Sequence, residues 1–309
     1  MKKIYINEAN ESWIVDRFRS EFINNNPNIC TENIKEASIV WIIAPWTWKK
    51  IPKKYLHQKK VLCTIHHLEE KELKGKQLRE FLKRDSYVDR YHLISKKTVG
   101  DFKSISDKEH THLPFWVNSK NYFHIEDKDN LREKYQFSVD DFILGSFQRD
   151  SEGRNTNTPK LIKGPDRLVE IFQNYWETQN KKNLKVLLSG YRRNYLINEL
   201  EKRQIPYRYF ERTDIKTLNE LYNILDLYIV SSRLEGGPQS IVEAAITKTP
   251  IISTDVGVAS EVLDESSIFN MDNFRDAKPD VQSAFNSVQK LLIPKQMKNF
   301  VDVFEDLVR

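Results

Sequence analysis

Short apolar runs alternate along the chain with longer segments in which apolar residues recur at helical spacing. The apolar runs favour buried strands because hydrophobic side chains fall on both faces, and they lie at 3–6, 37–44, 60–65, 91–94, 141–147, 184–190, 207–210, 225–232 and 249–256. The helical segments lie at 12–23, 76–84, 96–105, 166–176, 194–204 and 215–225, with a further apolar helix face after residue 238. This alternation predicts α/β architecture, with parallel sheets covered by helices on both faces.

A polar, turn-rich stretch at 118–130 interrupts the alternation. Because 309 residues exceed what one hydrophobic core usually serves, we expect two domains. We assign 1–135 to a first Rossmann-like domain, 136–285 to a second, and 286–309 to a C-terminal helical segment. Ligands bind beyond the carboxyl ends of parallel strands, so a cleft between the two sheets is the expected place for a site.

Composition narrows the class of protein. Charged residues make up 30% of the chain, and no apolar run approaches the ~18–20 residues of a membrane-spanning helix. The N-terminus turns polar at once, unlike a secretory signal, and Cys30 and Cys63 are too few for a disulfide framework or a zinc site. We therefore expect a cytoplasmic protein without a metal.

The net charge of +5 permits a weak attraction to anionic partners. There is no arginine-rich arm and no zinc-finger spacing in the sequence, so nucleic acid is not an expected partner.

The stretch SSRLEGGPQSIVEAA, residues 231–245, reads as a strand end, a turn and a helix start. It places two carboxylates, Glu235 and Glu243, eight residues apart at the mouth of a sheet. Carboxylates accept hydrogen bonds from vicinal hydroxyls, which sugars and riboses supply. The alternative that remains open is a solvated helix residue at Glu243 and an ordinary loop charge at Glu235.

The turn between the two carboxylates suits an anion. Gly236 and Gly237 let the backbone approach a ligand, and Pro238 fits the first turn of a helix. The amides of 239–241 then face the space before the helix, where the exposed N–H groups and the helix dipole favour a diphosphate.

Two cations stand upstream in a second strand-loop-helix segment. Arg149 follows the strand at 141–147, and Lys163 precedes the helix that starts near residue 166. They could neutralise a diphosphate without a metal, or they could be ordinary loop cations. Taken together, cations, helix-start amides and carboxylates predict a nucleotide-sugar site.

Segment 231–262 resembles the donor-site signature of retaining GT-B glycosyltransferases of the family 4 (glycosyl transferases group 1) type. The shared features are Glu235 and Glu243, separated by seven residues, and the small-residue strand and turn that follow. The segment LGSFQRD…KLIKGPDRLVEIF is similar to that family's Gly-Arg…Lys-Gly element, with Arg149 and Lys163 in the two cationic positions. The resemblance covers most of 140–265 and implies two Rossmann-like domains that face each other across a cleft, with C-terminal helices that can return to the N-terminal domain.

The resemblance also implies roles for residues. Glu235 would contact the donor sugar and Glu243 the ribose, while Arg149 and Lys163 would hold the diphosphate without a divalent metal. The turn would supply backbone donors, and Gly190 with the turn at 210–212 would border the nucleobase. The implied donor-binding residues are Glu243, Gly236, Gly237, Pro238, Gln239, Ser240, Ile241, Gly190, Phe210 and Arg212, and the implied catalytic residues are Glu235, Arg149, Lys163 and His66.

The N-terminal half is less similar to the family. CTIHH matches its strand-end Thr-x-His pattern, which puts His66 near the reacting sugar, although the neighbouring His67 could take that place and a histidine here could also be a core residue. The glycine-rich turn that the family commonly has after its first strand is replaced by NEANES.

The stretch WIIAPWTWKKIPKKYLHQKK, residues 41–60, mixes tryptophans with lysines. Such a mixture suits a membrane interface or a sugar-binding surface. It is also what a loop looks like when its tryptophans complete the N-terminal core and its lysines are solvated. Peripheral contact with the inner face of a membrane is therefore one of two open interpretations.

The function that follows from the resemblance is a metal-independent retaining glycosyltransferase. It would move a sugar from a UDP-, GDP- or ADP-linked donor to a glycan, lipid-linked or protein-linked acceptor, in polysaccharide biosynthesis. The alternatives are a catalytically weak nucleotide-sugar-binding subunit of a glycosyltransferase complex, and a GT-B sugar-nucleotide epimerase.

Overall fold

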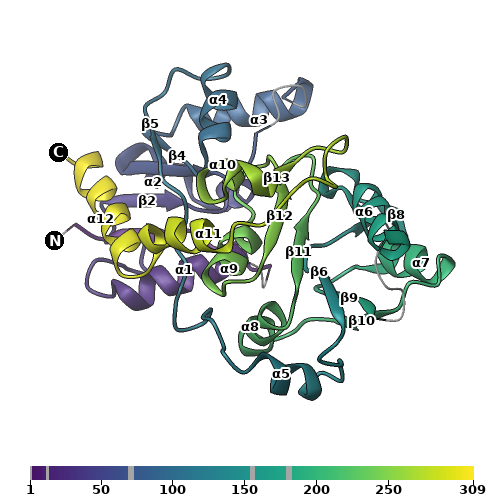
Figure 1. The fold of residues 1–309 in the computed structure, drawn as a ribbon. Coiled ribbons are helices and arrows are strands. Elements are labelled where there is room, and N and C mark those ends of the chain that lie inside the picture. The colour runs from purple at the N-terminus through teal and green to yellow at the C-terminus, as the bar shows by residue number, and fades with distance from the viewer. Residues whose placement is uncertain (1, 12–13, 69–72, 154–156, 179–182) are drawn as a thin grey trace. The chain divides into compact units, whose positions relative to one another are not determined.

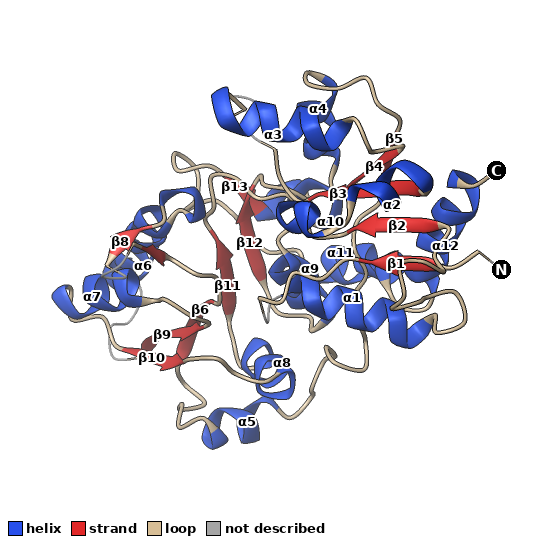
Figure 2. Ribbon diagram, turned by 180° about the vertical axis from the view of Figure 1, so that it is seen from behind, coloured by secondary structure: helices blue, strands red, loops and turns tan. Residues whose placement is uncertain are grey.

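A computed structural model describes residues 2–11, 14–68, 73–153, 157–178 and 183–309. Ser12 and Trp13, which begin the helix expected at 12–23, lie outside the described residues. The described chain divides into two compact units (Figures 1 and 2). Unit 1 comprises residues 1–116 and 293–309, and unit 2 comprises 117–292.

Unit 1 is built on a parallel sheet with strand order β1-β2-β3-β4-β5. Its strands are β1 (Ile4–Ile6), β2 (Ile39–Ile42), β3 (Lys60–Ile65), β4 (Arg90–Leu93) and β5 (His110–His112). Its helices are α1 (Ile14–Asn25), the 3₁₀ turn η1 (Pro45–Lys50), α2 (Lys53–Gln58), α3 (Gly75–Asp85), α4 (Lys96–Lys103) and α12 (Lys295–Leu307).

Alternate residues of the unit 1 strands face two cores, as the period of a strand requires. On one face, Trp41 packs with Phe22 of α1 and with Phe300 and Phe304 of α12. On the other face, residues of α2, α3 and α4 pack on the sheet. The C-terminal helix α12 thus belongs to unit 1, as expected for a chain whose end returns to its first domain.

Unit 2 has a parallel sheet with strand order β10-β9-β6-β11-β12-β13 and a short antiparallel pair, β7-β8. Its strands are β6 (Phe142–Ser146), β7 (Ser151–Glu152), β8 (Thr158–Pro159), β9 (Leu184–Ser189), β10 (Tyr207–Phe210), β11 (Leu227–Val230), β12 (Ile251–Thr254) and β13 (Ile268–Phe269). Its helices and 3₁₀ turns are α5 (Lys128–Lys134), η3 (Leu161–Lys163), α6 (Pro165–Thr178), α7 (Asn194–Lys202), α8 (Ile215–Asn223), α9 (Gln239–Ile246), α10 (Ala259–Val262), η4 (Glu265–Ser267), α11 (Val281–Val288) and η5 (Gln289–Leu291).

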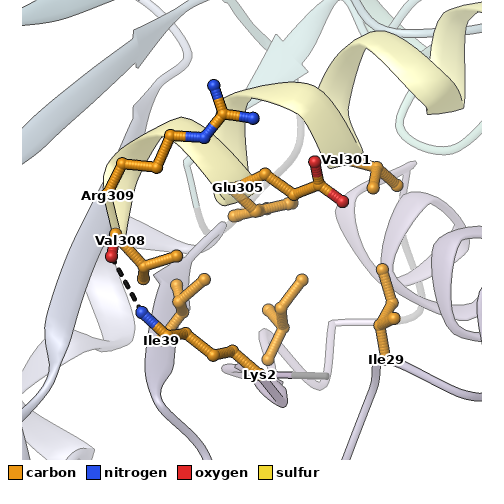
Figure 3. A pocket seen from close by; sticks show the side chains of 9 residues that line it. Lys2, Ile29, Ile39, Val301, Glu305, Val308 and Arg309 are labelled. Carbon is orange, nitrogen blue, oxygen red and sulfur yellow. Dashed lines mark hydrogen bonds between the residues drawn. The ribbon is translucent and has the colours of Figure 1, made fainter.

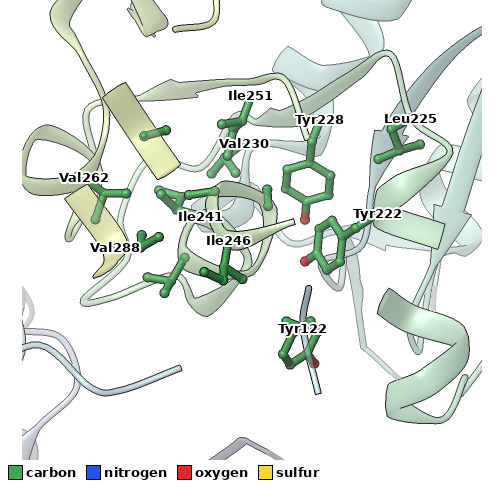
Figure 4. Close-up of a cluster of buried hydrophobic side chains, with 14 of the residues drawn as sticks. Tyr122, Tyr222, Leu225, Tyr228, Val230, Ile241, Ile246, Ile251, Val262 and Val288 are labelled. Carbon is green, nitrogen blue, oxygen red and sulfur yellow. The ribbon is translucent and has the colours of Figure 1, made fainter. Parts of the chain in front are cut away.

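Each face of the unit 2 sheet has its own core. One core contains residues of α6 and α7, and the other contains α9 together with buried tyrosines (Figure 4). The rings of Tyr222 and Tyr228 pack there at a tilt of 57°, with centroids 5.2 Å apart. The Tyr228 hydroxyl accepts from the N–H of Phe147 at 3.2 Å, directly after the carboxyl end of β6, where the candidate site lies.

The domain boundary differs from the one expected between 135 and 136. Residues 117–135 belong to unit 2 because α5 is anchored on α8: the guanidinium of Arg132 donates to the carbonyl of Ile224 at 3.1 Å and also pairs with Asp226. The backbone N–H of Ile125 donates to the side chain of Asn223 at 2.8 Å. The second boundary falls at 292/293 instead of 285/286, because α11 still packs on α9.

Candidate functional site

The strand order of unit 2 has a switch point between β6 and β11. From β6 the chain proceeds to β9 on one side, whereas β11 leads to β12 on the other side. At such a point the loops that follow the two central strands part, and ligands of open parallel sheets bind there. Here these loops carry Arg149 after β6 and Glu235 after β11.

The segment before α6 and the loop after β11 are joined along their backbones. The N–H of Arg233 donates to the carbonyl of Ile162 at 2.8 Å, and the Ser231 hydroxyl donates to the carbonyl of Gly164 at 2.8 Å. Gly164 has a φ of +63°, and a Cβ there would lie 1.9 Å from the Ser231 carbonyl oxygen. Only glycine allows both the left-handed conformation and this close approach.

This joint brings Lys163 and Glu235 together. The Nζ of Lys163 lies 2.5 Å from each carboxylate oxygen of Glu235, and both side chains are mostly buried. The Ser232 hydroxyl donates to the same carboxylate at 3.0 Å. Two residues 72 positions apart in the sequence, both expected in the site, therefore form its central ion pair.

Arg149 and Lys160 add further positive charge. The Nε of Arg149 donates to the Ser151 carbonyl at 2.8 Å, which fixes the stem of the guanidinium. The pKa of Lys160 is lowered by burial and then by the charges of Arg149 and Lys163. Lys160 therefore experiences the positive charges of Arg149 and Lys163, and an anion placed beside it would relieve that repulsion.

A buried ion pair that the sequence analysis missed supports the Arg149 loop. Arg193 is fully buried, and its Nε lies 2.6 Å from the carboxylate of Asp150. The same guanidinium donates to the carbonyls of Ser146 and Ser189, so it ties together the ends of β6 and β9. Nothing in the run YRRN marks Arg193 as buried, because the sequence shows only two adjacent arginines.

The glycine turn lies directly before α9, which begins at Gln239 with Pro238 as its N-cap residue. Gly257 supports it from the β12–α10 loop, because a Cβ there would come within 2.6 Å of the Gly236 carbonyl oxygen. The N–H of Ile241 donates to the Pro238 carbonyl at 3.0 Å. The expectation that the Ile241 amide points to a ligand is therefore not met in this conformation, since the first turn of the helix uses it.

Glu243 is not a solvated helix residue. It lies inside α9, is 5% exposed, and accepts a hydrogen bond from the hydroxyl of Tyr222 at 3.1 Å. Tyr222 in turn packs on Phe147, the first residue after β6, at a centroid distance of 4.8 Å. A buried carboxylate needs partners of this kind, so the open alternative of an ordinary surface charge is wrong.

The remaining expected residues lie at the ends of β9 and β10. Gly190 has a φ of +97°, and its N–H donates to the carbonyl of Phe210 at 3.3 Å. The Phe210 ring packs edge-on against Tyr135. The guanidinium of Arg212 lies 4.6 Å from the ring centre of Tyr191, an exposed side chain that the sequence analysis did not select.

In unit 1, His66 follows β3 and is partly buried. Its Nε2 lies 2.8 Å from the carbonyl oxygen of Ile43, and a carbonyl only accepts, so Nε2 carries the proton and Nδ1 is an acceptor. Burial lowers the pKa of His66 to about 4, which keeps the ring neutral at pH 7. The adjacent His67 is exposed.

The tryptophans of 41–60 divide into two kinds. Trp41 and Trp48 are buried in the two cores of unit 1, as expected if tryptophans complete the N-terminal core. Trp46 is exposed. The structure therefore supports the core interpretation for two of these rings and leaves the third to be explained.

A cavity of about 280 Å³ lies elsewhere in unit 1, between α12 and the amino ends of β1 and β2 (Figure 3). Ile4, Ile39 and Phe304 line it, and none of the expected site residues does. Among the described residues, no cluster of three or more His, Cys, Asp or Glu side chains could hold a metal ion. No helix in the described ranges has the length and hydropathy to cross a bilayer.

Part of the chain matches a known protein family, and the whole chain shares its fold with solved structures. Residues 158–302 match the family described as "Glycosyl transferases group 1", and no curated protein matches the sequence. HepE of Anabaena, in complex with UDP and glucose, is similar over 99% of this chain and 100% of its own, with a TM-score of 0.77 and 10% identity.

Two further solved structures share the fold. Sucrose-phosphate synthase of Thermosynechococcus elongatus has a TM-score of 0.69 at 15% identity, over 95% of this chain and 77% of its own. A variant of S. aureus TarM has a TM-score of 0.64 at 13% identity, over 93% and 58%. The chain thus has the two-sheet GT-B fold, and residues 158–302, just under half of the chain, match the glycosyl transferases group 1 family.

Proposed function

We propose that the protein transfers a sugar from a UDP-sugar to a saccharide, lipid-linked or protein-linked acceptor, with retention of the anomeric configuration. The observation that carries the proposal is the Lys163–Glu235 ion pair at the switch point of unit 2, beside Arg149 and Lys160. This arrangement combines concentrated positive charge for a diphosphate with a carboxylate for sugar hydroxyls.

The cations would act on the leaving group. As the bond from the anomeric carbon to the diphosphate stretches, negative charge grows on the phosphate oxygens. Arg149 and Lys163 would stabilise this charge in place of a divalent metal, and fixed charges of this kind are usually the largest catalytic contribution. The departing phosphate could then accept the proton of the acceptor hydroxyl, so no covalent nucleophile is assigned to the protein.

The carboxylates would take separate parts of the donor. Glu235 is tied to Lys163 and would bind hydroxyls of the donor sugar next to the phosphate. Glu243 lies deeper, next to Tyr222, and would bind the ribose. The backbone N–H groups of Gly236 and Gly237 and those of Gln239 and Ser240 would donate hydrogen bonds to the phosphates.

The choice of base rests on a relative and on one local feature. HepE has been solved with UDP and with UDP-glucose. In the present chain the exposed Tyr191 lies next to Gly190, and the guanidinium groups of Arg212 and Arg192 lie over its ring at 4.6 and 5.3 Å, so aromatic and positively charged groups stand together where a pyrimidine could lie. We therefore propose UDP rather than GDP or ADP as the nucleotide.

His66 would act from unit 1 as a neutral hydrogen-bonding group. Its protonated Nε2 is held by the Ile43 carbonyl, which leaves Nδ1 to accept a hydroxyl of the reacting sugar.

A ligand-induced stability assay tests the proposal. Wild type, Lys163→Ala, Glu235→Gln and the control Lys185→Ala are heated with UDP, GDP, ADP and UDP-glucose, each with EDTA. Lys185 also belongs to the unit 2 sheet and is partly exposed, but it lies near the amino end of β9 beside Asp141.

We expect UDP and UDP-glucose to raise the melting temperature of wild type and of Lys185→Ala, and not of Lys163→Ala. UDP-glucose hydrolysis or transfer by wild type in EDTA would establish turnover without a metal. A stabilising effect of GDP or ADP alone would contradict the choice of base. Binding without turnover with any acceptor would favour the catalytically weak binding subunit.

A further inference from the structure

Trp46 stands out among the aromatic side chains of unit 1. Its side chain is 48% exposed, whereas Trp41 and Trp48 on either side of it are buried. A large apolar ring left in water forgoes the stabilisation that burial would give it. A single exposed tryptophan could still be incidental, so its surroundings decide whether it serves a ligand.

The ring of Trp46 is held in place. Its indole N–H donates to the carboxylate of Glu11 at 2.9 Å. The backbone N–H groups of Asn10 and Glu11 are in turn bound by the carboxylate of Asp16 in α1, at 3.0 and 2.8 Å. The partner of the indole is therefore itself fixed to a helix.

The loop that carries Trp46 is fixed as well. Asn7 is buried, and its side chain donates to the Ala44 carbonyl at 3.0 Å and to the Thr47 hydroxyl at 2.8 Å. Its side-chain oxygen accepts from the N–H of Ala44 at 3.1 Å. These bonds tie the loop after β1 to the turn η1, so the exposed ring is displayed from a rigid support.

The ring also lies at the edge where ligands of parallel sheets bind. The loops after β1, β2 and β3 supply Glu11, Trp46 and His66 respectively. The Trp46 and His66 rings are 5.5 Å apart. An apolar face, a carboxylate and a neutral imidazole with an acceptor nitrogen thus stand together at the carboxyl ends of three adjacent strands.

We propose that Trp46 is the platform on which a pyranose ring of the acceptor stacks, which makes the acceptor a saccharide. A pyranose presents C–H groups on its face, which pack on an aromatic ring, and hydroxyls at its rim, which need acceptors such as Glu11. The inference rests on the proposed function and specifies the acceptor, which that function leaves open among three classes.

A membrane surface is the other partner that tryptophan and lysine suit. Here the indole N–H is engaged by a carboxylate, and the exposed Glu8 and Glu11 of the same loop would be repelled by anionic lipid. Lys49, three residues from Trp46, is paired with Glu80 of α3 at 2.5 Å. The carboxylates beside the ring therefore favour a neutral saccharide as the partner of Trp46, and the vesicle measurement below accounts for the exposed Lys50, Lys53 and Lys54 that follow it.

The test compares four proteins in the presence of saturating UDP: wild type, Trp46→Ala, Trp46→Phe and the control Phe123→Ala. Phe123 is exposed to almost the same degree as Trp46, 47%, but it lies in unit 2. Saturation-transfer NMR measures the binding of methyl α-glucoside, methyl β-glucoside, N-acetylglucosamine and maltotriose. Cosedimentation with phosphatidylglycerol vesicles and the UDP-induced thermal shift are measured in parallel.

We expect at least one saccharide to bind wild type and Phe123→Ala, at least tenfold weaker binding to Trp46→Ala, and partial recovery in Trp46→Phe. The UDP-induced shift should be the same in all four proteins, which shows that the variants are folded. Equal saccharide binding by wild type and Trp46→Ala would overturn the proposal. So would the absence of saccharide binding to wild type, or an effect of Trp46→Ala on vesicle binding alone. If UDP does not bind wild type, the proposed donor site fails, while the saccharide result still decides the role of Trp46.

Discussion

Replacing Gly164 with alanine tests whether the contact between the two loops builds the site. Gly164 has a φ of +63°, which costs a residue with a Cβ about 1–2 kcal/mol. The new methyl group would also stand 1.9 Å from the carbonyl oxygen of Ser231, a backbone atom that cannot turn away as a side chain can. Forcing such atoms apart typically costs a further ~1–3 kcal/mol.

Gly153 provides the matched control within unit 2. It also has a positive φ, +79°, but a Cβ there would meet only the Thr158 side chain, at an ordinary contact distance of 3.4 Å. Gly153→Ala should therefore lose only the ~1–2 kcal/mol of the left-handed conformation. The difference between the two variants isolates the cost of separating Gly164 from Ser231.

Thermal unfolding measures this difference. For a unit of this size 1 kcal/mol corresponds to ~2–4 °C, so Gly164→Ala should melt roughly 4–20 °C below wild type and Gly153→Ala only about 2–8 °C below it. Gly164→Ala should also lose most of the UDP-induced shift, because Lys163 and Glu235 meet through this joint. Equal melting temperatures and equal UDP shifts for the two variants would refute the reasoning.

Three further predictions concern single side chains. Glu243→Gln keeps the shape of the buried side chain and its contact with Tyr222, so the melting temperature of the variant should stay close to that of wild type. Its affinity for UDP-glucose, measured by calorimetry, should fall about tenfold, or ~1.4 kcal/mol. An unchanged affinity would show that Glu243 does not belong to the donor site. Asp150→Ala leaves the buried guanidinium of Arg193 without its carboxylate partner and should lower the free energy of unfolding in urea by about 3–5 kcal/mol. The double variant Asp150→Leu/Arg193→Met should regain a large part of this loss. Additive losses from the two substitutions would contradict the prediction. Burial lowers the pKa of His92 to about 3, so below pH 6.5 the unfolded chain binds a proton that the folded chain does not. The free energy of unfolding should therefore fall as the pH drops from 6.5 towards 3, by about 2 kcal/mol at pH 5. Urea unfolding of His92→Gln should show a weaker pH dependence over this range, and an identical dependence would refute the assignment.

The hydrophobic pattern predicted the sheets well because their central strands are buried on both faces. β3 and β11, for example, read as continuous apolar runs in the sequence. β5, His110–His112, gave no such signal, since it is a short polar edge strand that is only partly buried. The domain boundary near residue 117 also could not be predicted from the sequence. It depends on the unit against which α5 packs, and the contact between Arg132 and Asp226, nearly a hundred residues apart, determines this.

In the candidate site, too, some features could be predicted from the sequence and others could not. Arg149, Lys163, Glu235 and Glu243 could be selected because their spacing around strand ends is visible along the chain. The burial of Glu243 could not, since it depends on Tyr222 arriving from α8. Nor could the Asp150–Arg193 pair, whose partners are joined only when β6 and β9 become neighbours.

The two glutamates that bracket the glycine turn differ more in environment than their shared spacing suggests. Glu235 stands on a loop whose backbone is locked to the segment before α6, so contacts within the fold itself position Lys163 and the carboxylate. A site arranged in advance need not reorganise as charge develops on the leaving phosphate, which is the condition under which fixed charges accelerate a reaction most. Glu243 lies within α9 against a tyrosine core, where a carboxylate is stable only while its hydrogen bonds are kept. If both act on the donor, Glu235 would control the reacting end and Glu243 the nucleoside end. Glu235→Gln should then lower kcat more than it raises KM, whereas Glu243→Gln should act mainly on KM.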